Sequence, residues 1–467
     1  MGCELLHGAE ASPRKLVNAT STNIASGRFR ALAGLMLLLA GCAGNPAANP
    51  DRHFSGLRDI VTSLPPGGTL DLFLVHGMRA YSDQTYDDVI AAINERMPIE
   101  QDGTPTRTDL VTTDVPTVTL DGVPVFSADN WAMFEPYVVV ARYLTKDHQH
   151  HINFYKLNYW PALALMKCLF IISPDTLVVG SSDRAKFCTS KPWNATVNSR
   201  LSSAPDWGNE WIKTEIVEWG LADAAIATSD FRRVLHRTVR EALGMALNAA
   251  RAREGIQEDA TDDVGDKELE QFRQKDRTRF AFITQSLGSY VVHDSLYATD
   301  DPARSHVESI APYVVICGAT QVHMFANQLA LLRFSELQVA DGKSPKRTES
   351  EAARGEKPGR SHFFRGCQNQ NGAGSAKRGT EFAAQQVVAY HDPNDLLTYY
   401  TSDRPGYIGE KNVDTTNVVA PFTGTIVPFL LADPMKAHTG QATSRVIVDS
   451  VVCGHEPGNW KPCGVSR

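Results

Sequence analysis

Short apolar runs alternate with amphipathic stretches along most of the chain. The apolar runs predict strands buried on both faces, since each has about four to six residues and is bounded by turn-forming or polar residues. These runs are residues 71–75, 137–140, 152–157, 280–284, 313–317 and 386–390. Helical spacing of apolar positions marks residues 86–97 and, behind Ser229 or Asp230 as a possible N-cap, residues 231–247. The alternation predicts an α/β fold with a mostly parallel sheet covered by helices on both faces.

The amino-terminal segment has the pattern of a targeting signal and not of a folded element. Two arginines precede an apolar run over residues 31–41, which is too short to span a bilayer. The run ends in Leu39-Ala40-Gly41-Cys42, which resembles the lipobox of bacterial lipoproteins. That resemblance implies cleavage before Cys42 and a lipid on its thiol. With Ala43 following, it also implies an outer-membrane protein facing the periplasm. An ordinary secretion signal with a chance cysteine is the alternative.

Charge and cysteine content narrow the class of protein further. The 467 residues carry 46 Lys and Arg against 53 Asp and Glu, a net charge of −7, which disfavours a nucleic-acid partner. An exported chain permits disulfides, and short spacing predicts the pairs Cys168–Cys188 and Cys453–Cys463. Cys317, inside an apolar run, is a candidate free thiol. No cysteine or histidine pattern predicts a metal site, and no phosphate-binding glycine motif predicts a nucleotide cofactor.

Candidate chemistry begins where the predicted strand 280–284 ends. The segment Thr284-Gln285-Ser286-Leu287-Gly288 places a serine on a strand-to-helix turn between small residues. It resembles the nucleophile elbow of α/β-hydrolases, in which the turn exposes the hydroxyl and the next backbone N–H, here that of Leu287, faces the substrate oxyanion. Thr284 departs from this pattern, because a glycine usually stands there.

A second oxyanion donor is expected at the end of the first predicted strand. His76-Gly77 stands where these hydrolases have a turn whose following residue supplies a backbone N–H. The resemblance assigns that donor to Met78. The alternative is an ordinary strand ending.

The candidate acid follows the predicted strand 386–390. Asp392 and Asp395 both lie in the turn that follows, which is where the triad carboxylate of this family is found. Asp395 is the first choice because an apolar pair follows it, and Asp392 is the alternative. We expect the aspartate that is not catalytic to cap the turn.

Two histidines beyond this turn are candidates for the general base. His438 follows an apolar run and precedes a predicted helix, whereas His455 lies between two cysteines near the end of the chain. We favour His438 and keep His455 as the alternative. The order Ser286, Asp395, His438 is that of α/β-hydrolases and differs from the order in other serine hydrolase folds.

Taken together, residues 65–452 resemble an α/β-hydrolase of the lipase and esterase type. The resemblance implies a serine hydrolase that cleaves small-molecule or lipid acyl esters without a metal or cofactor. About 209 residues separate Gly77 from Ser286, which predicts a lid or cap within residues 158–228. The rival function is a non-catalytic envelope lipoprotein that uses the same scaffold for binding.

The predicted organisation of the chain has three parts. Residues 1–41 form the lipoprotein signal peptide, residues 42–58 a polar tether to the membrane, and residues 59–467 the hydrolase domain. A stretch rich in Lys, Arg, Glu, Gly and Ser over residues 342–380 reads as a solvated insertion in that domain.

Overall fold

The computed structural model describes most of the chain beyond the predicted tether. The described residues are 53–78, 83–111, 119–120, 123–124, 131–170, 220–257, 264–296, 306–332, 385–398, 413–420, 425–427, 431–432, 434–456 and 463. The predicted signal peptide with Cys42, most of the tether, most of the segment 158–228 and the whole insertion 342–380 lie outside them.

By its contacts the chain divides into two units. The smaller comprises Met1–Pro46 and Gly424–Ala432. Within it the structure describes one antiparallel pair, β12 (Thr425–Val427) with β13 (Leu431–Ala432). The larger unit is the rest of the chain and contains every other element described below.

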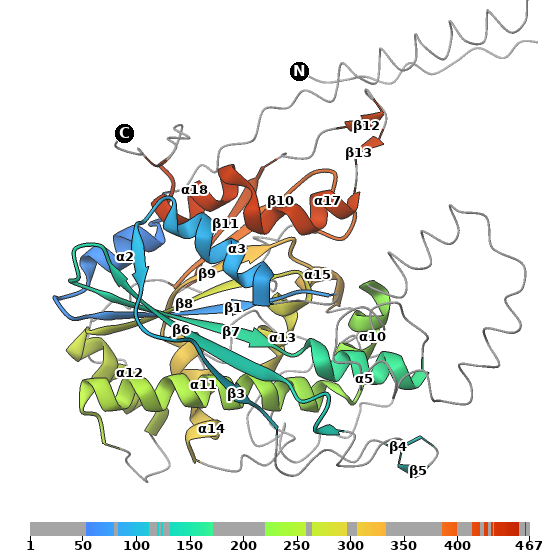
Figure 1. Ribbon diagram of the computed structural model, residues 1–467, viewed down its shortest axis with the longest axis horizontal. Coiled ribbons are helices and arrows are strands. Elements are labelled where there is room, and N and C mark those ends of the chain that lie inside the picture. The colour runs from blue at the N-terminus through green and yellow to red at the C-terminus, as the bar shows by residue number, and fades with distance from the viewer. Residues whose placement is uncertain are drawn as a thin grey trace, which may run out of the picture. The chain divides into compact units, whose positions relative to one another are not determined.

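A mixed sheet forms the centre of the larger unit (Figure 1). Nine strands of the described residues build it, in the order β11-β10-β9-β8-β1-β7-β6-β2, with β3 also paired to β6. In chain order they are β1 (Thr69–Val75), β2 (Ile99–Gln101), β3 (Thr106–Asp109), β6 (Tyr137–Thr145), β7 (His151–Asn158), β8 (Thr278–Gln285), β9 (Ala319–Phe325), β10 (Gln385–His391) and β11 (Val413–Val419). A separate short hairpin joins β4 (Thr119–Leu120) and β5 (Val123–Pro124).

The sheet is mostly parallel, as the apolar runs predict. Neighbouring strands from β7 through β1 to β11 pair in parallel, whereas β6 is antiparallel to β7, β2 and β3. The central strand β1 is buried at every position, which explains its largely apolar sequence; Thr69 and Asp71 are its polar residues.

Helices cover both faces of the sheet, as expected (Figure 1). The apolar residues of β1 divide between two cores: Leu70, Leu72 and Leu74 belong to one, and Phe73 and Val75 to the other. Helices α2 (Leu57–Ser63), α3 (Asp83–Asn94) and α18 (Arg445–Cys453) pack in the first core. The second core is built mainly by α5 (Trp160–Phe170), α10 (Ala222–Thr228), α11 (Arg232–Glu254), α12 (Val264–Lys275), α13 (Leu287–Ser295), α14 (His306–Ala311) and α15 (Leu329–Leu332).

One predicted strand is wrong. Residues 313–317 lie mainly in a π-helix, Pro312–Ile316, and the strand of this region is β9. A short apolar run reads alike in a buried helix and a buried strand, and Pro312 suits a first helical turn. The sequence did not predict β9 as a strand, because Gln321 and His323 interrupt its apolar pattern. Both polar residues are fully buried.

The cysteines pair more completely than expected. The disulfide Cys453–Cys463 is confirmed. Cys168 is also disulfide-bonded, and its predicted partner Cys188 lies outside the described residues. Cys317 takes part in a disulfide as well, so the prediction of a free thiol there is wrong. The sequence misleads because an apolar run around a cysteine is compatible with either state.

Within the described ranges, no helix combines the length and apolar character needed to cross a membrane.

Candidate active site

Ser286 occupies a sharp turn between β8 and α13. Its φ of 52° and ψ of −120° are rare for a residue with a side chain, and such backbone strain concentrates at functional sites. The Ser286 N–H donates to the Phe325 carbonyl oxygen at 2.8 Å, which ties the turn to the end of β9. The carboxyl end of β8 therefore holds the serine in a fixed, strained conformation.

Two glycines allow the chain to pass close to this turn. A Cβ on Gly288 would lie 2.4 Å from the His76 carbonyl oxygen and 2.6 Å from that of Val75. A Cβ on Gly77 would lie 2.6 Å from Ser286 Cβ. Neither position accepts a larger residue without moving backbone. The start of α13 and the His76–Gly77 loop thus close tightly around the serine.

Thr284, which stands where the resembled family usually has glycine, fits this turn. The residue is fully buried in β8, and its Oγ1 is hydrogen-bonded to Ser289 Oγ at 2.8 Å. Its hydroxyl also reaches the His323 carbonyl oxygen at 3.3 Å. The threonine therefore ties the strand to the helix through side-chain bonds where a glycine would leave space.

Ser286, His438 and Asp395 lie in one hydrogen-bonded line. Ser286 Oγ is 2.8 Å from His438 Nε2, and His438 Nδ1 is 2.9 Å from Asp395 Oδ2 and 3.0 Å from Oδ1. His438 comes from α17 (Pro434–Thr439) and Asp395 from the turn after β10. All three residues are buried. With Nδ1–H donating to the carboxylate, Nε2 accepts the serine proton, which suits a general base for a serine nucleophile.

Further donors fix the carboxylate of Asp395. The Leu397 N–H donates to Oδ1 at 2.9 Å, and the Thr398 hydroxyl donates to Oδ2. Gln441 Nε2 donates to Oδ2 at 3.4 Å, while its Oε1 accepts from the Ala326 N–H at 2.7 Å. Gln441 was not among the predicted site residues, although it lies three residues after His438 and hence near it on a helical path.

The two alternative residues lie in other settings. Asp392 Oδ1 accepts from the Asn394 N–H at 2.8 Å and from its side-chain amide at 3.1 Å, so this aspartate caps the turn. His455 forms a two-way backbone bridge with Phe54, and their rings stack at 5.8 Å. The structure brings neither side chain into the line of Ser286 and His438.

His76 shapes the loop that carries Met78. Its Nδ1–H donates to the Gly77 carbonyl oxygen at 2.7 Å, and its Nε2 accepts from the Tyr159 N–H at 3.2 Å. The Tyr159 hydroxyl donates to the His76 carbonyl oxygen at 2.6 Å, and the two rings stack at 4.0 Å. These contacts hold the backbone of the His76–Gly77 loop in one conformation. Met78 directly follows Gly77, which packs on Ser286. The Leu287 N–H belongs to the first turn of α13, where helical N–H groups have no intrahelical acceptor.

Three buried histidines of the described residues make the fold sensitive to acid. Burial lowers the pKa of His76 and His323 to about 3 and that of His391 to about 4. In the unfolded chain these imidazoles titrate near 6.5, so below that pH the unfolded state binds more protons than the folded state. Their stabilising effect is complete above pH 6.5 and is lost as the pH falls toward the folded values.

We therefore expect the free energy of unfolding to fall between pH 7.5 and pH 5, by about 2 kcal/mol for each of these histidines. Urea unfolding at both pH values measures it. In the His391→Gln variant, whose amide can still donate to Asn417 Oδ1 as His391 does at 3.0 Å, the loss should shrink by about a third. Equal unfolding free energies of the wild type at the two pH values would contradict this prediction.

No cluster of three or more histidine, cysteine, aspartate or glutamate side chains that could hold a metal ion occurs in the part of the chain that the structure describes. Comparison of the chain with protein-family models, with curated proteins and with solved structures found no match in any of the three.

Proposed function

We propose that the protein is a serine hydrolase of the α/β-hydrolase type that cleaves carboxylic esters. The observation that carries the proposal is the hydrogen-bonded line of Ser286, His438 and Asp395 on a strained strand-to-helix turn. The position of this turn in the middle of a mostly parallel sheet, at the carboxyl end of β8, agrees with the resemblance of residues 65–452 to that family.

The reaction begins when Ser286 Oγ attacks the ester carbonyl carbon and His438 Nε2 takes the hydroxyl proton. Asp395 holds the imidazole in the required tautomer and stabilises the imidazolium. The N–H groups of Met78 and Leu287 stabilise the oxyanion of the tetrahedral intermediate. His438 then gives its proton to the leaving alcohol, and a water molecule, activated in the same way, releases the acid from Ser286.

Part of the predicted lid region lies close to the proposed oxyanion loop. A Cβ on Gly220, just before α10, would lie 3.6 Å from Met78 Cε. Ser286 itself is 1% exposed. These two observations support the lid or cap predicted within residues 158–228, which would open to admit the substrate.

A fluorophosphonate probe tests the proposal without knowledge of the natural substrate, because it reacts with activated serines. We expect labelling of the wild type and none of Ser286→Ala. Ser63→Ala, which changes a serine on α2 that donates to the Ile60 carbonyl oxygen, is the control and should be labelled like the wild type. A folded wild type that resists the probe would favour the non-catalytic lipoprotein.

We further propose that a lipid on Cys42 anchors the protein to the bacterial outer membrane. Cys42→Ser should then move the protein from the membrane fraction to the soluble periplasm, because the lipid supplies the membrane affinity. Esterase activity should stay unchanged, since this cysteine is the first residue of the predicted tether and lies outside the predicted hydrolase domain. Cell fractionation with immunoblotting measures the distribution, and a variant that stays in the membrane fraction would refute the anchor.

A further inference from the structure

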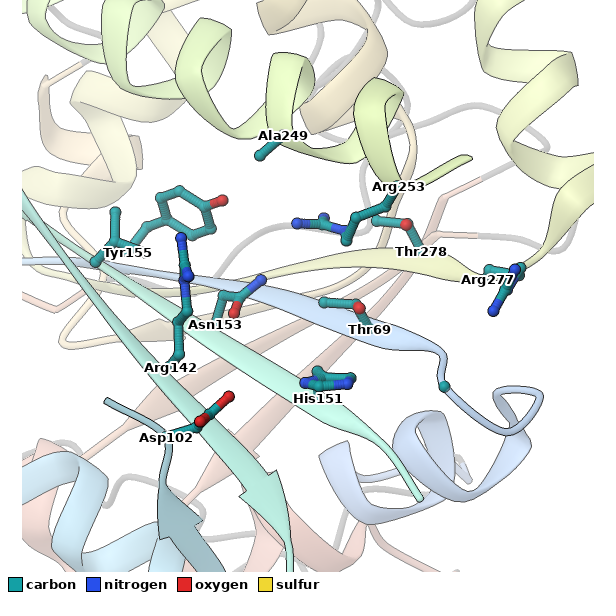
Figure 2. Close-up of a pocket in the computed structure, with 12 residues that line it drawn as sticks. Thr69, Asp102, Arg142, His151, Asn153, Tyr155, Ala249, Arg253, Arg277 and Thr278 are labelled. Carbon is teal, nitrogen blue, oxygen red and sulfur yellow. The ribbon is translucent and has the colours of Figure 1, made fainter. Parts of the chain in front are cut away.

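A pocket of about 520 Å³ opens at the amino-terminal ends of β1, β7 and β8 (Figure 2). Its wall includes Thr69, His151 and Thr278, the first residues of these strands, and Ala249 and Arg253 from α11. Ser286 and the His76 loop lie at the opposite, carboxyl ends of β1 and β8. Because a strand of this length spans about 20 Å, the pocket is distinct from the proposed active site.

The strand register gives the pocket a polar floor. Residues paired across parallel or antiparallel strands share a face of the sheet. One row across the sheet consists of Thr278, Thr69 and His151, and the next of Asp71, Asn153 and Arg142. The row after these contains Phe73 and Tyr155, whose rings stack at 4.8 Å in the apolar core. The polar rows therefore end where the core begins.

Positive charge gathers in this pocket. Arg142, Arg253 and Arg277 line it together with one carboxylate, Asp102. A second carboxylate, the fully buried Asp71, is bound by Arg253. Its other oxygen accepts from Asn153 Nδ2 at 2.7 Å.

Two of the arginines act on the same hydroxyl. Arg253 is hydrogen-bonded to the Tyr155 phenol, and Arg142 lies close enough to act on it electrostatically. In Figure 2 both side chains extend toward Tyr155. No carboxylate of the described residues lies within ion-pair distance of Arg142 or Arg277.

Thr278 adds a second, independent feature. Its side chain is 4% exposed and lines the pocket, and its Oγ1 has no hydrogen-bond partner among the described residues. A buried hydroxyl without a partner costs about 1–3 kcal/mol, so such groups usually meet a ligand or water. The same pocket thus presents an unused hydrogen-bonding group and two guanidinium groups, those of Arg142 and Arg277, that no carboxylate of the described residues neutralises.

We propose that this pocket binds a small organic anion, a carboxylate or a phosphate monoester. Its oxyanion group would lie beside Arg253 and the Thr278 hydroxyl, since guanidinium groups match the geometry of these oxyanions. Arg142, three strands away from Thr278 in the sheet, would add its positive charge across the pocket. The apolar part of the ligand would pack on Tyr155 and Ala249. The volume is that of a small-molecule site. The proposal does not depend on the hydrolase activity.

Isothermal titration with phenyl phosphate and with benzoate tests the proposal, and benzamide serves as the uncharged control. We expect the wild type to bind at least one of the two anions and not benzamide. Which anion binds distinguishes a phosphate ligand from a carboxylate ligand. Arg142→Gln and Thr278→Val should each weaken binding at least about tenfold, or 1.4 kcal/mol. Arg445→Gln removes a similar charge from the exposed side of α18 and should bind like the wild type.

Thr278→Val keeps the side-chain shape and removes a buried hydroxyl that has no partner among the described residues, so we expect its melting temperature without ligand to be at least that of the wild type. Loss of affinity in this variant then reports on the ligand and not on folding. Absence of binding by the wild type at about 10 mM of either anion would overturn the proposal, as would equal affinities of the wild type and both pocket variants. Fluorophosphonate labelling of the pocket variants should equal that of the wild type. Failure of anion binding and failure of the hydrolase proposal can therefore be told apart.

Discussion

Ser286→Ala and His438→Ala are each expected to lower kcat on a p-nitrophenyl ester by about 10⁴-fold or more. The reason is the single hydrogen-bonded line that these residues form with Asp395: without the base the serine is a weak nucleophile, and without the serine the base has nothing to activate. The double variant should therefore lose little more than either single variant. Asp395→Asn should cost less than removal of the serine, because the imidazole and the oxyanion donors remain. Steady-state kinetics of the purified variants measure all four.

The alternative residues supply the matched controls for this experiment. Asp392→Asn and His455→Gln change side chains that cap a turn and stack on Phe54, respectively, so both should retain kcat within about tenfold of the wild type, or 1.4 kcal/mol. Turnover that survives His438→Ala but not His455→Gln would move the base to His455. An active wild type matched by Ser286→Ala would end the serine hydrolase proposal.

Lys167→Met is expected to lower the free energy of unfolding by about 3–5 kcal/mol. Lys167 Nζ lies 3.0 Å from Asp223 Oδ1, and both side chains are 0% exposed. Removal of the lysine leaves the fully buried Asp223 carboxylate without this counter-ion, which is more costly than the loss of the attraction itself. Because the pair joins α5 to α10, the substitution should weaken the packing of these two helices, which belong to the region of the proposed lid. Urea denaturation followed by circular dichroism measures it.

The double variant Lys167→Met/Asp223→Leu should recover much of this loss, since no buried charge remains. Arg445→Met is the surface control: its side chain is 77% exposed beside Asp449, so we expect a change within about 1 kcal/mol. If Lys167→Met proves as mild as Arg445→Met, the buried pair does not stabilise the fold as argued.

Local sequence was sufficient to predict the elements that depend on local chemistry. The apolar run of β1 and the spacing of α11 indicated those elements because burial dictates both patterns. Ser286 stood out because a strand, a turn and a small residue meet within a few positions. The predicted strand over residues 313–317 is wrong, because nothing within so short an apolar run distinguishes a buried strand from a buried helix.

Features that depend on tertiary packing could not be predicted. The choice between His438 and His455 needs the distance to Ser286, which the order of residues does not contain. Gln441 acts through Asp395 and Ala326, far away in the chain. The arginine pocket could not be predicted because it depends on the register of β1 against β7 and β8.

Residues near the start of the described chain make contacts with residues more than 300 positions later. The Ser55 N–H donates to Gln386 Oε1, which lies 331 residues further along, and Phe54 pairs with His455. The central strand β1 likewise waits for β8 before both its edges are covered. Loop closure over such separations makes folding slow. Residues Phe54 and Ser55 therefore emerge long before their partners during synthesis, so these contacts cannot form until most of the chain is present.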